Sequence, residues 1–458
     1  MQTSLESISN AIVKLRWDKN FAQALQIYRN QIHGRFSRDE ICGNHKLIGA
    51  IADCLKETGK IQEAIKMIEK IWQIDFQALQ NPALLTNLAW IYFFALDATN
   101  RNALYSNRNR TSIIIRLLDH AVGTNPKLAG LLFFRYIETL AGMLPPDWSA
   151  AENLFRLYNN ETFSNEPGLV TIQIKGKPKE TALASDREKW FVWKTKVLFA
   201  LNKWEACIDT CKKALEAISR FHHGNQHWIT RRMAQSFRQM GDIKQAIHEF
   251  EKLLQKRSDW FIEKELAEIY LQQNETQKAL SIGLLACINQ GFSEYKTGLF
   301  QLTGQIFRAA NQTLEACRMF WLAYLIRAQQ QWKTPNELKE ALAKCPPFPQ
   351  KTAESFYNEI ISDWKKSGKY DAIAKVQSEK TIHGNGTITR ILHDGSNGDG
   401  FITDTQGRSI YFRFSNCKIP VQEIVESMEV GFSARAIERK NQKVFNATKV
   451  YKGKAVDK

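Results

Sequence analysis

Two short aromatic segments near the end of the sequence carry the side chains best suited to bind a ligand. They are Gly398–Thr403 (GDGFIT) and Ile410–Ser415 (IYFRFS). If both are strands, Phe401 shares a face with Tyr411 and Arg413, because alternate side chains of a strand lie on one side. Bases stack on exposed aromatic rings at roughly 1–3 kcal/mol each, and a neighbouring cation attracts the phosphates. The pattern therefore predicts a surface for single-stranded nucleic acid.

The remaining apolar side chains of these segments are expected in a core. Ile402, Ile410 and Phe412 alternate with the surface residues, so they point to the opposite face of each strand. Gly407, in the TQGR stretch between the segments, predicts a hairpin turn that would pair the two strands.

From about Lys380 to Lys452 the chain resembles a cold-shock domain, a five-stranded barrel of the OB type. GTITRI (386–391) resembles the first strand, GDGFIT and IYFRFS resemble the two nucleic-acid-binding motifs, and 431–435 and 444–450 resemble the last two strands. The resemblance implies a small all-β barrel over residues 380–453, followed by a basic tail at 454–458.

The resemblance also implies which residues touch the strand. Phe401, Tyr411 and Phe414 match its stacking positions, and Arg413 stands where the family usually has a histidine. The expected nucleic-acid-binding residues are Arg390, Phe401, Tyr411, Arg413, Phe414 and Lys418.

Three positions depart from the family pattern. Arg390 replaces a tryptophan, Asn397 replaces a lysine, and Asp399 replaces a ring with a carboxylate that repels phosphates. They leave an alternative open, in which a degenerate barrel packs on the rest of the protein and binds no nucleic acid. In that case Asp399 is expected to pair with a basic side chain of the helical part, on the 353–379 segment.

The first ~345 residues show a repeated spacing. A Gly or Asn turn residue is followed four or five positions later by an alanine that opens an apolar helical stretch. The pairs are Asn20–Ala24, Gly59–Ala64, Asn202–Ala206, Gly241–Ala246, Asn274–Ala279 and Asn311–Ala316. A further unit is expected around Thr111–Ala121, inside the longest gap. The spacing resembles degenerate tetratricopeptide-type repeats of about 34 residues, which implies an α-solenoid of helical hairpins.

Breaker residues divide the chain. The Gly- and Pro-punctuated segment 160–185 is expected to be an inserted loop or hairpin between repeats at 1–159 and 186–345. Adjacent prolines in Cys345–Gln350 end the array, because proline cannot continue a helix. Residues 346–379 are then a linker and a capping helical hairpin, with helices at 353–366 and 370–379.

The formal net charge is +16, with the basic residues spread over the whole chain. Such a charge suits a polyanionic partner, because each phosphate contact releases counterions. The alternative is that these side chains only solvate helix faces. The residues of a possible basic track are Arg101, Arg108, Arg110, Lys175, Lys177, Lys179, Arg231 and Arg232.

No metal site is predicted. The eight cysteines include no CxxC pair, and Cys207 and Cys211, four apart in a helical run, lack further ligands. We therefore expect buried free thiols in a reducing compartment. The histidines of RFHHGNQHW (220–228) are expected in a solvated linker.

No catalytic motif occurs in the sequence either. GxxxxGK[ST], GxGxxG, GxSxG and HExxH are all missing. We expect no catalytic residue and no cofactor, with a ribonuclease or toxin component as the enzymatic alternative. No apolar run approaches ~20 residues, and the start of the sequence has no signal-peptide pattern, so a cytoplasmic protein without membrane contact is expected.

The sequence as a whole predicts a mainly α protein, an α-solenoid of TPR-like hairpins followed by an OB-type barrel. Its expected function is that of a non-enzymatic adaptor for single-stranded RNA or DNA, with RNA favoured. The groove of the repeats is expected to hold a protein partner or to extend the basic track. A protein-interaction scaffold with an inactive barrel is the alternative.

Overall fold

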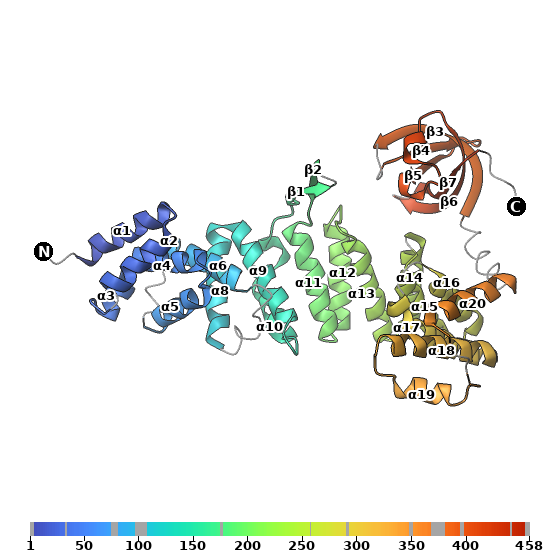
Figure 1. Ribbon diagram of the computed structural model, residues 1–458, viewed down its shortest axis with the longest axis horizontal. Helices are drawn as coiled ribbons and strands as arrows, with labels where there is room; N and C mark the ends of the chain where they lie inside the picture. The colour runs from blue at the N-terminus through green and yellow to red at the C-terminus, as the bar shows by residue number, and fades with distance from the viewer. Residues whose placement is uncertain are drawn as a thin grey trace. The chain divides into compact units, whose positions relative to one another are not determined.

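A computed structural model describes residues 4–32, 34–74, 81–96, 108–174, 177–256, 258–289, 293–347, 351–367, 381–393, 398–439 and 442–453. The chain divides into two compact units, 1–240 and 241–458. Helices dominate the first unit, and the second contains helices followed by a closed β-barrel (Figure 1). The predicted fold class, helical hairpins and then a small all-β barrel, is confirmed.

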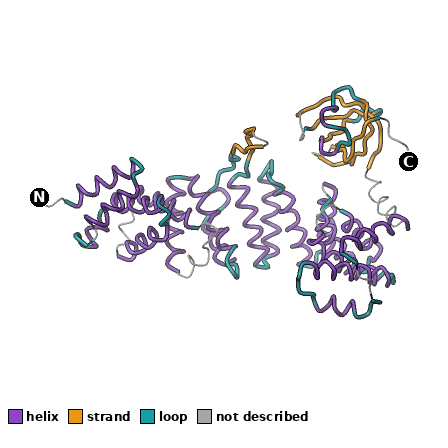
Figure 2. Tube along the Cα trace, viewed as in Figure 1, coloured by secondary structure: helices purple, strands orange, loops and turns teal. Residues whose placement is uncertain are grey.

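Successive helices of the first unit pack against one another as hairpins. Their bounds are α1 (Leu5–Trp17), α2 (Phe21–Ile27), α3 (Arg38–Gly43), α4 (His45–Glu57), α5 (Ile61–Ile74), α6 (Pro82–Ala95), α8 (Arg108–Thr124), α9 (Pro126–Ala141), α10 (Trp148–Leu157), α11 (Asp186–Ala200), α12 (Trp204–Ala217) and α13 (Asn225–Gln239). An antiparallel pair of strands, β1 (Leu169–Ile174) and β2 (Lys177–Ala182), follows α10 and precedes α11 in the chain and is drawn in orange among the helices of this unit (Figure 2). The segment expected as an inserted loop or hairpin therefore contains a hairpin.

After the first, each helix of the second unit packs against the one before it, except the last, which packs against the helix two places earlier in the chain. They are α14 (Ile243–Lys256), α15 (Trp260–Gln272), α16 (Thr276–Ile288), α17 (Thr297–Ala309), α18 (Thr313–Gln329), α19 (Asn336–Leu342) and α20 (Ala353–Lys366). α20 has the bounds expected from the sequence, beyond the proline-rich segment. The second helix expected at 370–379 lies outside the described residues.

The repeated spacing has a simple structural basis. A residue with a left-handed backbone ends one helix, and the small residue five positions later is buried in the helix that follows. These pairs are Lys19 and Ala24, Gly59 and Ala64, Asn202 and Cys207, Gly241 and Ala246, Asn274 and Ala279, and Asn311 and Ala316.

Two of the predicted pairs are therefore corrected. The left-handed residue of the first pair is Lys19 and not Asn20. In the Asn202 unit the buried small residue is Cys207, whereas Ala206 is exposed. In every unit the buried small residue comes five positions after the left-handed residue, and this constant spacing identifies Lys19 and Cys207. A cysteine is small enough for the position that alanine fills in the other units. The unit expected around Thr111–Ala121 is present as α8, with Ala121 fully buried.

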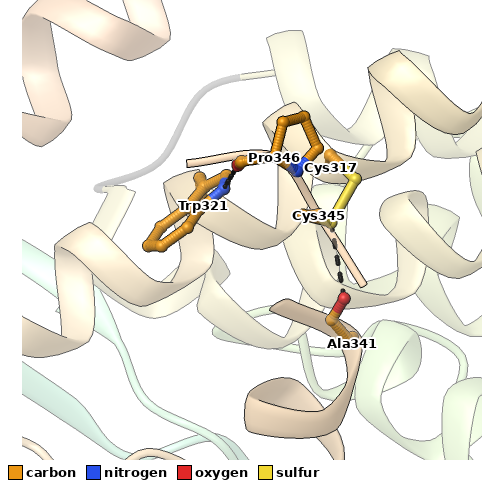
Figure 3. Close-up of a disulfide and its surroundings, with 5 residues drawn as sticks. All are labelled: Cys317, Trp321, Ala341, Cys345 and Pro346. Atoms are coloured by element: carbon orange, nitrogen blue, oxygen red, sulfur yellow. Dashed lines mark hydrogen bonds between the residues drawn. A yellow bond between two sulfur atoms is a disulfide. The ribbon is translucent and has the colours of Figure 1, made fainter. Parts of the chain in front are cut away.

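The expectation of free thiols is wrong for two cysteines. Cys317 on α18 and Cys345 after α19 form a disulfide, with their Cα atoms 5.5 Å apart (Figure 3). Beside it, the Trp321 indole N–H donates a hydrogen bond of 3.2 Å to the carbonyl of Pro346. The packing of α19 on α18 brings together residues 28 positions apart. No local spacing motif announces such a pair, so the sequence could not predict it.

The barrel consists of β3 (Thr381–His393), β4 (Asp399–Asp404), β5 (Ser409–Arg413), β6 (Glu429–Arg439) and β7 (Gln442–Lys452). The strands close in the order β3-β4-β5-β7-β6, with β5 and β7 parallel. A small closed barrel of five strands is the OB-type architecture. Its core contains the residues predicted to point inward, with Ile402, Ile410 and Phe412 fully buried beside Ile388 and Phe432.

Candidate nucleic-acid interface

The turn between β4 and β5 fixes the pairing of the two aromatic strands. Gly407 has a left-handed backbone, with φ +75°. One carboxylate oxygen of Asp404 accepts the backbone N–H groups of Gln406, at 3.0 Å, and Arg408, at 2.7 Å. The other oxygen accepts the Arg408 Nε at 2.6 Å. The predicted hairpin turn is confirmed, and its register places Phe401 directly opposite Tyr411.

Four side chains lie in one line across four strands. Arg390 of β3 pairs with Phe401 of β4, Phe401 with Tyr411 of β5, and Tyr411 with Asn446 of β7. The rings of Phe401 and Tyr411 are 5.7 Å apart at 65°. Both are partly exposed, and Arg390 is exposed. We call these four residues the aromatic row: two accessible rings between a cation and an amide.

A glycine permits the close approach that builds the aromatic row. A Cβ atom on Gly400 would lie 2.4 Å from the carbonyl oxygen of Arg390, nearer than real Cβ contacts come. Glycine in a strand often marks such a close backbone approach. The second glycine of GDGFIT therefore allows β3 to lie tightly against β4, which sets Arg390 beside Phe401.

Asp399 has a role that the sequence did not indicate. One of its carboxylate oxygens accepts the Tyr411 hydroxyl at 2.6 Å, and the other lies 2.6 Å from His393 Nδ1. Arg413 is its register partner on β5. The alternative interpretation expected a basic partner on the 353–379 segment, but both hydrogen-bond partners belong to the barrel. The carboxylate thus fixes the tip of a ring in the aromatic row.

The protonation of this pair is well defined. The hydrogen bond from Tyr411, supported by His393, lowers the pKa of Asp399 below its ordinary value. Burial raises the pKa of the Tyr411 hydroxyl, and the bond to Asp399 raises it further. At neutral pH the carboxylate is charged and the phenol stays protonated, so the phenol donates to the carboxylate.

Two predicted binding residues stand in different surroundings. Phe414 is only 4% exposed and stacks on Phe412 in the core, with ring centroids 5.8 Å apart. The reason is that β5 ends at Arg413, and a 3-10 turn (Phe414–Asn416) breaks the strand alternation. This corrects the sequence assignment, because a buried ring offers no stacking surface. Lys418 is exposed, and its backbone N–H donates to the carbonyl of Val450 at 2.7 Å.

The possible basic track is described only in part. Arg101 and Lys175 lie outside the described residues, as do the side chains of Arg108, Arg110, Lys177 and Lys179. The side chains of the remaining two residues of the track, Arg231 and Arg232, are described, and their surroundings differ.

Arg231 is partly exposed, with its guanidinium 5.5 Å from the ring centroid of Trp228. Arg232 instead donates hydrogen bonds to the carbonyl of Val192 and, at 3.1 Å, to the hydroxyl of Thr195. Burial lowers the pKa of Arg232. Arg232 therefore joins α13 to α11 and is unsuited to track a phosphate backbone, which corrects its assignment.

Sequence reasoning missed two residues of the interface. Asn446 is partly exposed beside Tyr411, and His393 is 75% exposed beside Asp399. The β5–β7 pairing that brings Asn446 to the aromatic row is parallel and joins distant segments, so no local pattern signals it. For His393, the only signal in the sequence was its place six residues before Asp399.

Among the described residues, no group of three His, Cys, Asp or Glu side chains could hold a metal ion. The same part of the chain contains no helix whose length and apolarity would allow it to cross a bilayer.

Comparisons with known proteins add little at the level of sequence. No protein-family model matches the chain, and no curated protein matches it. Among solved structures, human IFIT1 in a dimer with m7Gppp-AAAA is 16% identical with a TM-score of 0.35, over 73% of this chain and 70% of that one. Pseudomonas aeruginosa PilF is 13% identical with a TM-score of 0.30, over 67% and 99%. A tetratricopeptide repeat protein from Parabacteroides merdae is 12% identical with a TM-score of 0.29, over 73% and 98%. Similarities of this size bring no function to this chain.

Proposed function

We propose that the protein is a non-enzymatic adaptor that binds single-stranded nucleic acid, RNA in particular, on the aromatic row of its barrel. The observation that supports this proposal is the line of Arg390, Phe401, Tyr411 and Asn446 across four adjacent strands. Two partly exposed rings beside positively charged side chains suit a single strand, because bases stack on aromatic rings and phosphates are attracted to positive charge.

The residues of the aromatic row and the neighbouring Arg413 each make a different contact with the strand in this proposal. Phe401 and Tyr411 stack on two bases, and their edge-to-face packing holds each ring in place. Arg390 and Arg413 are exposed near the rings and contact phosphates. Asn446 carries an amide that can donate to and accept from a base edge.

Asp399 supports nucleic-acid binding by holding the Tyr411 ring in place and does not itself contact the strand. Its carboxylate is partly screened, because Tyr411 and His393 occupy both oxygens. The cost of a negative charge near phosphates is thereby reduced, and the gain is a fixed Tyr411 ring.

The helical repeats complete the proposed adaptor. Helical hairpins stacked in sequence create extended surfaces that suit protein partners. We assign to them either a protein partner or, through the exposed basic residues, an extension of the same strand.

Fluorescence anisotropy with a labelled pyrimidine-rich single strand tests the proposal on the full chain. The Phe401→Ala, Tyr411→Ala double variant should bind much more weakly than the wild type. Val425→Ala, which truncates another exposed apolar side chain of the barrel, should bind normally and serves as the matched control. Equal affinity of the double variant and the wild type, with both folded, would refute the proposal.

A further inference from the structure

The first unit contains a cavity of about 300 Å³ whose lining fits a ligand of its own. α9 contributes Phe134 and Glu138, α11 contributes Lys189 and Trp193, and the segment entering α13 contributes His223 and Asn225. The remaining lining is apolar. A mostly apolar cavity of this size with a few convergent polar groups is the usual form of a small-ligand site.

A buried carboxylate holds the rim of this cavity in place. Glu188, whose side chain is 1% exposed, accepts the backbone N–H of His222 and the Nδ2 of Asn225, and it also lies 2.8 Å from His222 Nδ1. Between them, His223 has a left-handed backbone with φ +50°. The bonds from Glu188 to the residues on either side hold that conformation in place. The rim is therefore preformed.

The cavity also offers hydrogen-bond acceptors that nothing in the chain uses. Glu138 is a partly exposed residue of the cavity wall, and its carboxylate has no hydrogen bond or ion pair with any residue that the structure describes. Lys189, on the same wall, is bound to Asp186 at 2.9 Å and lies 5.6 Å from the ring of Phe134. The Glu138 oxygens are therefore available to accept hydrogen bonds from donors on a ligand.

We propose that this cavity binds a guanine base. Its flat ring suits walls made by Phe134, Trp193 and aliphatic side chains. Its N1–H and exocyclic N2–H point the same way, so they can donate side by side to the two oxygens of Glu138. Adenine sets a ring acceptor against that carboxylate. A guanidinium could match the two donors, but it would bring a second cation beside Lys189, whereas a guanine nucleotide brings phosphate that the ammonium attracts.

The cavity and the aromatic row share no residue, so each proposal can fail alone. Isothermal titration of the full chain with GMP and AMP is the direct test. GMP should bind, and AMP should bind at least about tenfold more weakly, as expected for a lost pair of base-edge hydrogen bonds. Glu138→Gln should weaken GMP binding by about the same factor. Glu161→Gln, an exposed acid of the same unit, should leave GMP binding unchanged.

The guanine could belong to a free nucleotide or to a strand, and competition separates the two. Displacement of GMP by a short oligonucleotide ending in guanosine identifies the strand as the source, and failure to displace it identifies the nucleotide. Melting temperatures confirm that the variants are folded. The proposal is overturned if GMP does not bind, if Glu138→Gln binds it equally well, or if arginine amide binds more tightly than GMP.

Discussion

Replacing Tyr411 by alanine is the change that most sharply tests the interface. It removes one of two stacking rings, which is worth roughly 1–3 kcal/mol of binding free energy. It also removes the edge-to-face partner of Phe401, 5.7 Å away, and leaves Asp399 without its hydroxyl donor. Both further losses act in the same direction, since Phe401 becomes less ordered and the carboxylate repels phosphate more strongly. We expect affinity to fall by about 5- to 150-fold.

Tyr411→Phe is the matched variant that separates stacking from positioning. It keeps the ring but loses the 2.6 Å bond to Asp399, which should cost about 1.5–3 kcal/mol in folding stability, as for other bonds to charged groups. Its affinity should change by less than about 1 kcal/mol, because the stacking surface remains. Anisotropy titrations of the full chain measure affinity, and urea unfolding measures stability. If Tyr411→Ala binds like the wild type while folded, the reasoning is refuted.

Four further outcomes are expected. Arg413→Gln should flatten the log–log salt dependence of oligonucleotide binding by about 0.7 if Arg413 contacts one phosphate; an unchanged slope argues against that contact. Phe412→Ala should destabilise the barrel by about 3–5 kcal/mol in urea unfolding, because the ring is fully buried; a loss below 1 kcal/mol would contradict its core position. Folding lowers the pKa of Asp399, so above about pH 4 the wild type should have a higher free energy of unfolding than Asp399→Asn. This difference in unfolding free energy should shrink as the pH falls through the pKa of Asp399 in the folded protein. A difference that widens on acidification would contradict this. Cys345→Ser should cost about 3–4 kcal/mol, since the disulfide closes a separation of 28 residues; unfolding with and without dithiothreitol checks this, and no difference for the wild type would count against the bond.

Much of the helical part could be predicted because its signals are local. A left-handed turn residue and a small residue five positions later lie within one loop and one helix turn, so the spacing survives in the sequence. The errors arose because only Gly or Asn was expected at the turn and only alanine at the buried small position. Cys207 fills a position expected for alanine, and Lys19 adopts a conformation expected for Asn20.

The interface was predictable only as far as strand alternation extends. Phe401 and Tyr411 share a face because each alternates with buried neighbours. Phe414 was misassigned because the strand ends one residue earlier, at Arg413. The hydrogen bond from Tyr411 to Asp399 and the place of Asn446 depend on pairing between strands, which no single segment encodes.

Photochemical cross-linking of the full chain to a labelled pyrimidine-rich single strand, followed by peptide mass spectrometry, tests the central claim most directly. Stacked bases cross-link to the rings they touch, so modified peptides are expected at Phe401 and Tyr411 on β4 and β5. The Phe401→Ala, Tyr411→Ala variant should lose those products. A strand that binds the protein but cross-links only to residues outside the barrel would contradict the account.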